Sequence, residues 1–324
     1  MRGLAASLTF WAILPVFSAW AGLALWVQFP QVRGLMLAFL TVAIGLVIWQ
    51  RLSGGWGWTG LGLLVAVMMG WFFSLAPQQN RDWAEDVSRM VQGRVEDDLV
   101  HLENIRDFRW SGPKTTTQEL WTSRTVDLNT LQGVDVITSV WGNPDIAHVL
   151  VSFRFQGTDP LTFSVEIRRE KGEKFSPLGG FFRQFELSLI AAEEADIVQW
   201  RAVPRAEEVR LYPLTLTPEQ TRQIFLRFVD LGNDLNAAPR WYNTVTANCT
   251  TVAWRLSRVL SPDLPLSPSL LLSGRLPQYL DRLGVLAGPG TLEEKRQRAL
   301  ISDRARTMPA GAGFSDWIRA DPRP

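Results

Sequence analysis

The sequence predicts an α+β protein in which three membrane-spanning helices precede a soluble domain of strands and helices. Three observations predict this class. Arg2, Arg33, Arg51 and Arg81 are the only ionisable side chains up to residue 81, whereas all 32 Asp and Glu residues follow. Alternation of apolar and polar residues indicates strands from residue 136 onward. A capped helix and a second helix, each with one apolar face, are then expected between residues 217 and 260.

Three apolar runs, at residues 8–29, 34–50 and 59–76, are close to the length that crosses a bilayer. A helix needs about 20 apolar residues to do so. Charged side chains are costly in lipid, and the arginines lie beside the runs rather than within them. Tryptophans stand near the expected ends of the runs, as interfacial anchors do: Trp26, Trp49, Trp56, Trp58 and Trp71. The sequence therefore predicts a multi-pass membrane protein.

The arginines also indicate an orientation. With the N-terminus in the cytoplasm, Arg2 and Arg51 lie inside and Arg33 outside, which the positive-inside rule favours by a single charge. Three spans then place the remainder of the chain on the outer side. We expect a membrane segment at residues 1–80, a soluble α+β domain at 81–262, and a helical or irregular C-terminal extension at 263–324.

Strand and hairpin patterns fill the first part of the soluble domain. Apolar residues at helical spacing predict a juxtamembrane helix over Asp82–Asp97. Five strands are expected: Leu99–Trp110, His148–Phe155, Leu161–Arg169, Ala195–Trp200 and Glu208–Leu211. The second and third flank Gln156–Pro160, which predicts a hairpin with a five-residue turn.

Two helices follow the strands. Thr217, Pro218 and Gln220 match a capping box with proline at the first helical position. The residues expected to be buried on this helix are Ile224, Phe225, Phe228, Leu231 and Leu235. The second helix begins at or next to Cys249 and ends before Pro262.

Cys249, the only cysteine, is the candidate nucleophile. At the first turn of a helix, unpaired N–H groups and the helix dipole stabilise a thiolate and lower the pKa of the thiol. The same N–H groups can hold an oxyanion. A single cysteine excludes an intramolecular disulfide.

His148 is the candidate base for this thiol. It opens a strand after a loop-like stretch, and an imidazole there can take the thiol proton. The other histidine, His101, is interpreted as structural. In the expected hairpin register Leu150 lies opposite Glu166, so Glu166 and Ser164 share the face of His148. Glu166 is the predicted orienter of the imidazole.

Other classes of function find no support in the sequence. The chain has no basic stripe for nucleic-acid phosphates and no glycine-rich phosphate loop or dinucleotide fingerprint. Two histidines and one cysteine, widely spaced, do not make a zinc ligand set. We expect no cofactor, no metal and no nucleic-acid partner. The sequence does not indicate an oligomeric state.

Several short motifs are shared with a known family: Asn104–Phe108, Ile146–His148, Phe163–Glu170, Trp241–Asn243 and Asn248–Thr251. With them, the stretch from about Trp83 to Leu260 resembles the Lnb N-terminal periplasmic domain family, named for a bacterial lipoprotein N-acyltransferase. The resemblance implies a bacterial inner-membrane protein whose soluble domain lies in the periplasm, and membrane phospholipid and lipoprotein as substrates.

The order of His148 before Cys249 also resembles the lecithin:retinol acyltransferase group. These are circularly permuted relatives of NlpC-like, papain-like thiol enzymes, and they move acyl groups from phospholipid through a Cys thioester. The resemblance implies a permuted papain-like (NlpC-like) fold with an antiparallel sheet and a catalytic-Cys helix. Thr250-Thr251 stands where His-Phe is usual, and Glu166 is expected in place of a second histidine. The residues expected to support the site or its oxyanion are Asn248, Thr250, Tyr242 and Ser164.

Three functions are therefore open. The first is a membrane-anchored thiol acyltransferase or lipase that acts through an acyl-Cys intermediate. The second is a cysteine peptidase or amidase of the cell envelope, which would use the same chemistry. The third is a non-catalytic, membrane-anchored binding module that has kept the fold.

Overall fold

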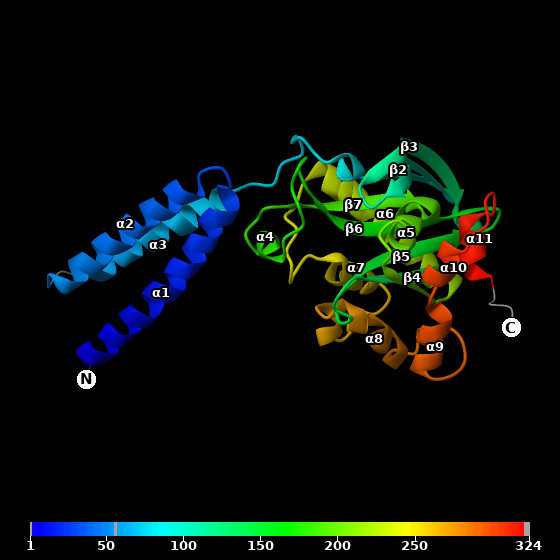
Figure 1. Ribbon diagram of the computed structural model, residues 1–324. Helices are drawn as coiled ribbons and strands as arrows, with labels where there is room; N and C mark the ends of the chain where they lie inside the picture. The colour runs from blue at the N-terminus through cyan, green and yellow to red at the C-terminus, as the bar shows by residue number, and fades with distance from the viewer. Residues whose placement is uncertain (1, 55–56, 321–324) are drawn as a thin grey trace. The chain divides into compact units, whose positions relative to one another are not determined.

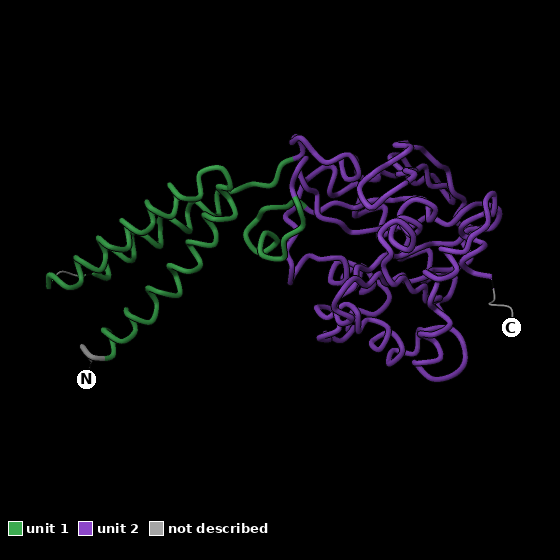
Figure 2. Tube along the Cα trace, viewed as in Figure 1, with its two compact units in different colours: residues 1–78, 174–186 green, residues 79–173, 187–324 purple. Residues whose placement is uncertain are grey.

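The computed structural model describes residues 2–54 and 57–320, so Trp56 lies outside the described residues. The chain divides into two compact units (Figures 1 and 2). Unit 1 comprises residues 1–78 and 174–186, and unit 2 comprises residues 79–173 and 187–324.

Unit 1 contains three long apolar helices. They are α1 (Arg2–Gln28), α2 (Arg33–Leu52) and α3 (Gly57–Ser74). All three are long and apolar enough to cross a membrane, as predicted. Their cores are small, because Phe10 and Leu14 of α1 pack against Val47 and Leu61 of the other two helices, while many apolar side chains stay exposed. Exposed apolar side chains on such helices are what a lipid environment requires.

Unit 2 is built around an eight-stranded sheet. Its strands run in the order β1-β2-β7-β6-β5-β4-β8, and β3 pairs with β2. The β2–β7 pair is parallel, whereas the β1–β2, β2–β3, β4–β5, β4–β8 and β5–β6 pairs are antiparallel. The strands are β1 (Gln92–Glu96), β2 (Leu99–Gly112), β3 (Thr115–Asp127), β4 (Leu131–Val140), β5 (Ala147–Phe155), β6 (Thr158–Arg168), β7 (Glu186–Glu193) and β8 (Glu208–Pro213).

Helices cover both faces of this sheet (Figure 1). On one face, Leu150 and Ile190 pack against α5, α10 and α11. On the other, Phe153 and Phe163 contact Phe225 of α6 edge to face. The remaining helices are α4 (Pro177–Phe181), α5 (Glu194–Ala202), α6 (Pro218–Ala237), α7 (Cys249–Ser257), α8 (Leu276–Arg282), α9 (Leu292–Ala299), α10 (Ser302–Arg306) and α11 (Phe314–Arg319). Short 3-10 turns lie at Glu85–Val87, Leu128–Thr130, Pro268–Leu270 and Ser273–Arg275.

The two helices predicted after residue 217 are confirmed. Thr217 caps α6, and its hydroxyl and the Gln220 side chain form the reciprocal capping box. All five residues predicted to be buried on α6 are buried. Asn248 caps α7, so Cys249 is its first residue.

The predicted hairpin forms, but with a shorter turn. The loop between β5 and β6 is Gln156–Gly157, and Gly157 has a φ of 78°, which favours glycine. β6 therefore begins at Thr158, and Leu150 lies opposite Ser164 rather than Glu166. A shift of two residues keeps every side chain on its predicted face, whereas a shift of one would have reversed the faces.

The helix predicted over Asp82–Asp97 is wrong. This stretch is extended, with one 3-10 turn and then β1. Its backbone pairs with other strands, because the Ala84 N–H donates to the Arg169 carbonyl and the Val91 N–H to the Leu189 carbonyl. The apolar spacing resembled that of a helix, but the two valines are buried in different places: Val87 packs in the core with Leu150 and Ile190, and Val91 lies beside Gly232 of α6.

The strand predicted at Ala195–Trp200 is wrong too, because these residues form α5. Most buried positions of α5 have helical spacing, and the full set is Glu194, Asp196, Ile197, Val198, Arg201 and Ala202. Three of these residues are charged and paired inside the protein, so the apolar pattern was incomplete. Strand β7 was not predicted, because nearly all its residues are buried and it shows no alternation.

Candidate active site

His148 and Glu166 face one another across the β5–β6 hairpin. The His148 Nε2 atom lies 3.1 Å from Glu166 Oε1 and 2.7 Å from the Ser164 hydroxyl. The Ser164 hydroxyl donates to the same Glu166 oxygen at 2.7 Å. The His148 side chain is 11% exposed. The hairpin register therefore brings together the three residues that sequence reasoning placed on one face.

Arg201 contacts the same carboxylate oxygen of Glu166 that His148 and Ser164 contact. Its Nη2 donates to Glu166 Oε1 at 3.0 Å, and its Nη1 lies 3.6 Å from Glu207 Oε2. Glu207 also accepts a hydrogen bond from Ser139 and pairs with Arg205. Arg201 is buried, and sequence reasoning did not find it. The available signal was its place, three positions after Val198, in the buried stripe of α5.

Cys249 begins α7, and its loop is fixed by side-chain hydrogen bonds. The Asn248 Oδ1 accepts from the N–H groups of Thr250 and Thr251 at 2.9 and 2.8 Å. The Thr251 hydroxyl accepts from the Asn248 N–H at 2.9 Å. In the preceding turn, the Asn243 Oδ1 accepts from two backbone N–H groups. These hydrogen bonds hold the backbone on both sides of the start of α7.

The thiol and the imidazole change each other's proton affinity. Burial raises the pKa of Cys249, but the charge of His148, a hydrogen bond with it and the Val149 N–H outweigh burial, so the pKa of the thiol is lowered. Burial and Arg201 lower the pKa of His148, whereas the Glu166 carboxylate, the Cys249 thiolate and their hydrogen bond raise it to about 9. This coupling favours a thiolate–imidazolium pair at neutral pH.

Glu166 stays ionised inside this site. Burial raises the pKa of its carboxyl, but the charge of His148, its hydrogen bond and then Arg201 outweigh burial and hold the pKa well below its usual range. Since Nε2 of His148 is engaged by Glu166 and Ser164, Nδ1 is the nitrogen left for the thiol. A carboxylate that fixes one ring nitrogen orients the other toward the nucleophile.

The groups available for an oxyanion differ from the predicted set. The Thr250 N–H is taken by the Asn248 cap, and the Thr250 hydroxyl lies 3.8 Å from the Cys249 sulfur. Within residues 2–54 and 57–320, nothing hydrogen-bonds to the Cys249 N–H or to the Tyr242 hydroxyl. Burial, then the charges of Cys249 and Glu166, raises the pKa of Tyr242, so the phenol keeps its proton and can donate it.

The C-terminal extension holds the strand that carries His148. The Ser273 hydroxyl donates to the Ala147 carbonyl at 2.6 Å and accepts from the Ala147 N–H at 2.9 Å. Arg275 binds both carboxylate oxygens of Asp145 at 2.7 and 2.8 Å. A Cβ on Gly274 would lie 2.0 Å from the Pro144 carbonyl oxygen. The close approach needs glycine, and it fixes the start of β5.

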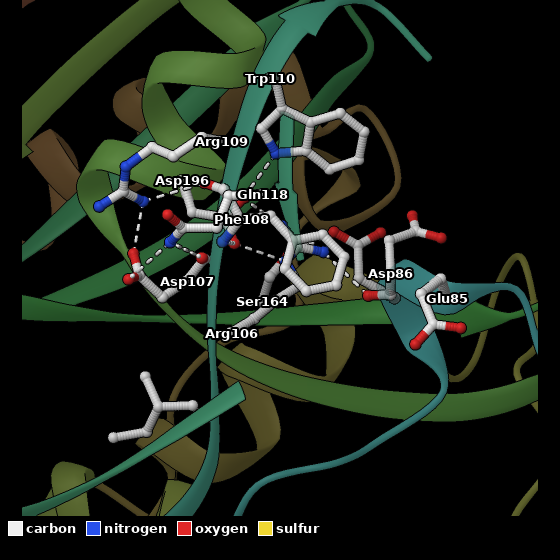
Figure 3. A network of polar contacts seen from close by, with 12 residues as sticks. Glu85, Asp86, Arg106, Asp107, Phe108, Arg109, Trp110, Gln118, Ser164 and Asp196 are labelled. Atoms are coloured by element: carbon white, nitrogen blue, oxygen red, sulfur yellow. Dashed lines mark hydrogen bonds and ion pairs between the residues drawn. The ribbon is translucent and has the colours of Figure 1, made fainter. Parts of the chain in front are cut away.

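A buried ion pair supports the site from the side of α5. Figure 3 shows this network together with Ser164. Arg106 of β2 donates to both carboxylate oxygens of Asp196 at 2.7 and 3.0 Å. Asp196 also accepts from the Phe108 N–H at 3.0 Å and from the Trp110 indole at 2.8 Å. Asp196 therefore has four donors and fixes α5, the helix that carries Arg201, to β2.

Replacing Glu166 with Gln is expected to lower the pH at which His148 loses its proton from about 9. The substitution removes the carboxylate that favours the imidazolium, while burial and Arg201, which oppose it, remain. The measurement is an NMR titration of the full-length protein in detergent micelles with isotope-labelled histidine. The chain has two histidines, and His101→Gln assigns their signals.

Glu96→Gln is the matched control for this titration. Glu96 Oε2 lies 3.1 Å from His101 Nε2, the same separation as in the His148–Glu166 pair. This variant should leave the His148 midpoint unchanged. An unchanged His148 midpoint in Glu166→Gln would show that Glu166 does not set the proton affinity of the imidazole.

Three apolar helices and an extramembrane α+β sheet domain define this chain as a membrane-anchored protein. The model for the Lnb N-terminal periplasmic domain matches residues 117–278, half of the chain, and the chain belongs to this family. The family predicted from the motifs is thus confirmed. The match begins after Asn104–Phe108, extends beyond Leu260 and includes Cys249, His148 and Glu166. Comparisons with curated proteins and with solved structures gave no significant match.

Proposed function

We propose that this chain is a membrane-anchored thiol enzyme that moves acyl groups of lipid or lipoprotein through an acyl-Cys249 intermediate. The observation that carries the proposal is the Glu166–His148 pair, 3.1 Å apart, together with the position of Cys249 at the start of α7, where the charge of His148 lowers the pKa of the thiol. Activation of a thiol requires a base beside the nucleophile and a third group that orients the base.

The first half-reaction forms the acyl-enzyme. The Cys249 thiolate attacks the ester carbonyl, the C–S bond forms, and the C–O bond breaks. The His148 imidazolium gives its proton to the departing alkoxide, so an alcohol such as a lysophospholipid leaves. The Cys249 N–H and the Tyr242 hydroxyl are the proposed donors to the oxyanion of the tetrahedral intermediate.

The second half-reaction releases the acyl group. An amine or water attacks the thioester, the new C–N or C–O bond forms, and the C–S bond breaks. His148 takes the proton of the attacking group, which regenerates the thiolate–imidazolium pair. Glu166 stays ionised throughout and stabilises the imidazolium, and Arg201 keeps Glu166 in place.

The surroundings of Cys249 favour a lipid acyl group. The cysteine packs against an apolar cluster from the sheet, α7 and α8: Val136, Val149, Trp254, Leu276, Tyr279, Leu280 and Leu283, with Leu214. An acyl chain enters apolar surroundings at little cost, whereas a polar peptide leaves its amide groups without hydrogen-bond partners there. The cluster therefore supports an acyl substrate over an envelope peptide.

The permuted papain-like fold and the inner-membrane topology are part of this proposal. In support of the fold, the strand with His148 precedes the helix with Cys249, and the two elements meet at the site. In support of the topology, the positive-inside rule favours a cytoplasmic N-terminus by a single charge, three helices are long and apolar enough to span, and the family is that of a periplasmic domain.

Acyl-enzyme trapping tests the proposal. Full-length protein in mixed micelles of detergent and phospholipid with a labelled acyl chain is quenched in acid and analysed for protein-bound label. We expect label that neutral hydroxylamine releases and that Cys249→Ala lacks. Label that persists in Cys249→Ala, or no label in the wild-type protein, contradicts the proposal. Labelling of Cys249 only by peptide-based acylating probes favours the peptidase alternative instead.

A further inference from the structure

Residues 174–186 connect β6 to β7 and belong to unit 1. Within that unit they pack against the ends of two apolar helices. At the end of α1, the Gln28 Nε2 donates to the carbonyls of Phe182 and Arg183 at 2.5 and 2.9 Å. At the end of α3, the Arg183 guanidinium donates to the carbonyls of Phe72 and Leu75 at 2.8 and 3.1 Å. The segment is therefore tied to both helix ends by hydrogen bonds, and Arg183 caps the end of α3.

The residues where the segment contacts the helix ends are of the types that are common at a membrane–water boundary. Phe182 is buried and packs against the rings of Trp20 and Phe72. The Arg183 guanidinium lies over the Phe72 ring, 4.7 Å from its centroid, and Arg33 lies 4.6 Å from the centroid of Trp26. Aromatic rings and arginines gather at the level where a span leaves the hydrocarbon. The segment is thus held at that level of the helices.

The segment carries large apolar side chains that remain uncovered. Ser176 caps the short helix α4, and Phe175, Leu178 and Phe181 on and beside it are 52%, 37% and 48% exposed. Phe73, beside the capped end of α3, is 62% exposed, so the apolar surface continues from the span to the segment. Lys174, at its start, is exposed and can remain among lipid headgroups.

We propose that residues 174–186 form a membrane-interface segment that inserts Phe175, Leu178 and Phe181 into the boundary between phospholipid headgroups and acyl chains. The partner is the phospholipid bilayer, because the exposed apolar surface is continuous with that of the spans. Apolar side chains on a short segment bind this boundary when they lie parallel to it. Along the chain the segment follows β6, which carries Ser164 and Glu166.

Lipid-borne quenching tests this proposal and requires no catalysis, so its outcome is independent of the proposed function. In a Cys249→Ser background, single cysteines at Leu178→Cys and Phe181→Cys are labelled with a polarity-sensitive fluorophore. The full chain is placed in vesicles of phosphatidylethanolamine and phosphatidylglycerol, with or without phospholipid brominated near the top of its acyl chains. We expect blue-shifted emission and loss of most of the intensity with the brominated lipid.

Leu120→Cys is the matched control, because Leu120 is similarly exposed, at 46%, on β3 of unit 2. Its label should not be quenched. If the labels on the segment are quenched no more than the control label, the proposal is overturned, whatever the position of their emission maximum. Labels that are blue-shifted and unquenched would mean that protein rather than lipid covers the segment.

Discussion

Replacing His148 with Gln is expected to slow alkylation of Cys249 by iodoacetamide on the order of 100-fold at about pH 6.5, because an ordinary thiol has a pKa of about 8.5. The imidazolium is the main group that lowers the pKa of this thiol, and without it burial prevails and raises the pKa. Cys249 is the only cysteine, so every alkylated molecule reports on it. The measurement is the rate of alkylation against pH for the full-length protein in detergent.

The same variant should form the acyl-enzyme about 10²–10⁴-fold more slowly, since the leaving alkoxide loses its proton donor. His101→Gln is the control. His101 contacts the Thr125 hydroxyl at 2.9 Å and Glu96, and no proposed step involves it. Equal alkylation profiles for His148→Gln and the wild-type protein would show that the thiol is not activated by the imidazole.

Replacing Asp196 with Ala is expected to lower the free energy of unfolding of the sheet domain by about 3–5 kcal/mol, the usual cost of leaving a buried charge without its partner. Asp196 is fully buried, and the Arg106 guanidinium, 2% exposed, would lose both of its carboxylate contacts. The Phe108 N–H and the Trp110 indole would lose their acceptor as well. Urea unfolding of the full-length protein in micelles, followed by tryptophan fluorescence, measures the change.

Asp230→Ala is the control for this comparison. The Asp230 carboxylate and the Arg227 guanidinium are 3.5 Å apart, and both side chains are more than half exposed. Water solvates these charges when the pair is broken, so its loss should not change the unfolding measurably. Similar unfolding curves for the two variants would contradict the role assigned to the buried pair.

Several parts of the molecule could be predicted from sequence because their signals are local. The spans follow from runs of apolar residues without charge, and every such helix satisfies its own backbone. The capping box at Thr217 involves residues three positions apart, so it identifies the start of α6. The helix that begins at Cys249 was predicted from the apolar spacing of the residues that follow it, and the structure adds a capping box at Asn248.

The sharing of one face by His148, Ser164 and Glu166 was also predictable, although the register was not. Strand alternation fixes the face of each residue, whereas the length of the turn fixes which residues lie opposite one another. The expected turn was longer than the observed Gln156–Gly157 loop. The prediction of a common face survived because the difference amounted to an even number of residues.

By itself the sequence determined three spans, two amphipathic helices, one hairpin and the family, since each depends on residues that are close along the chain or on a short motif. Only the tertiary structure decided that 82–97 is extended, that 194–202 is a helix, and that Arg201 holds Glu166. In each case a distant partner provides the stabilising contact. Charged residues are stable inside α5 because each meets a partner of opposite charge from another element. Asp196 pairs with Arg106 of β2. Arg201 pairs with Glu166 of β6 and with Glu207. The spacing of apolar residues in one segment does not reveal such partners. A charged side chain can be buried only where another part of the chain supplies an opposite charge or a hydrogen bond.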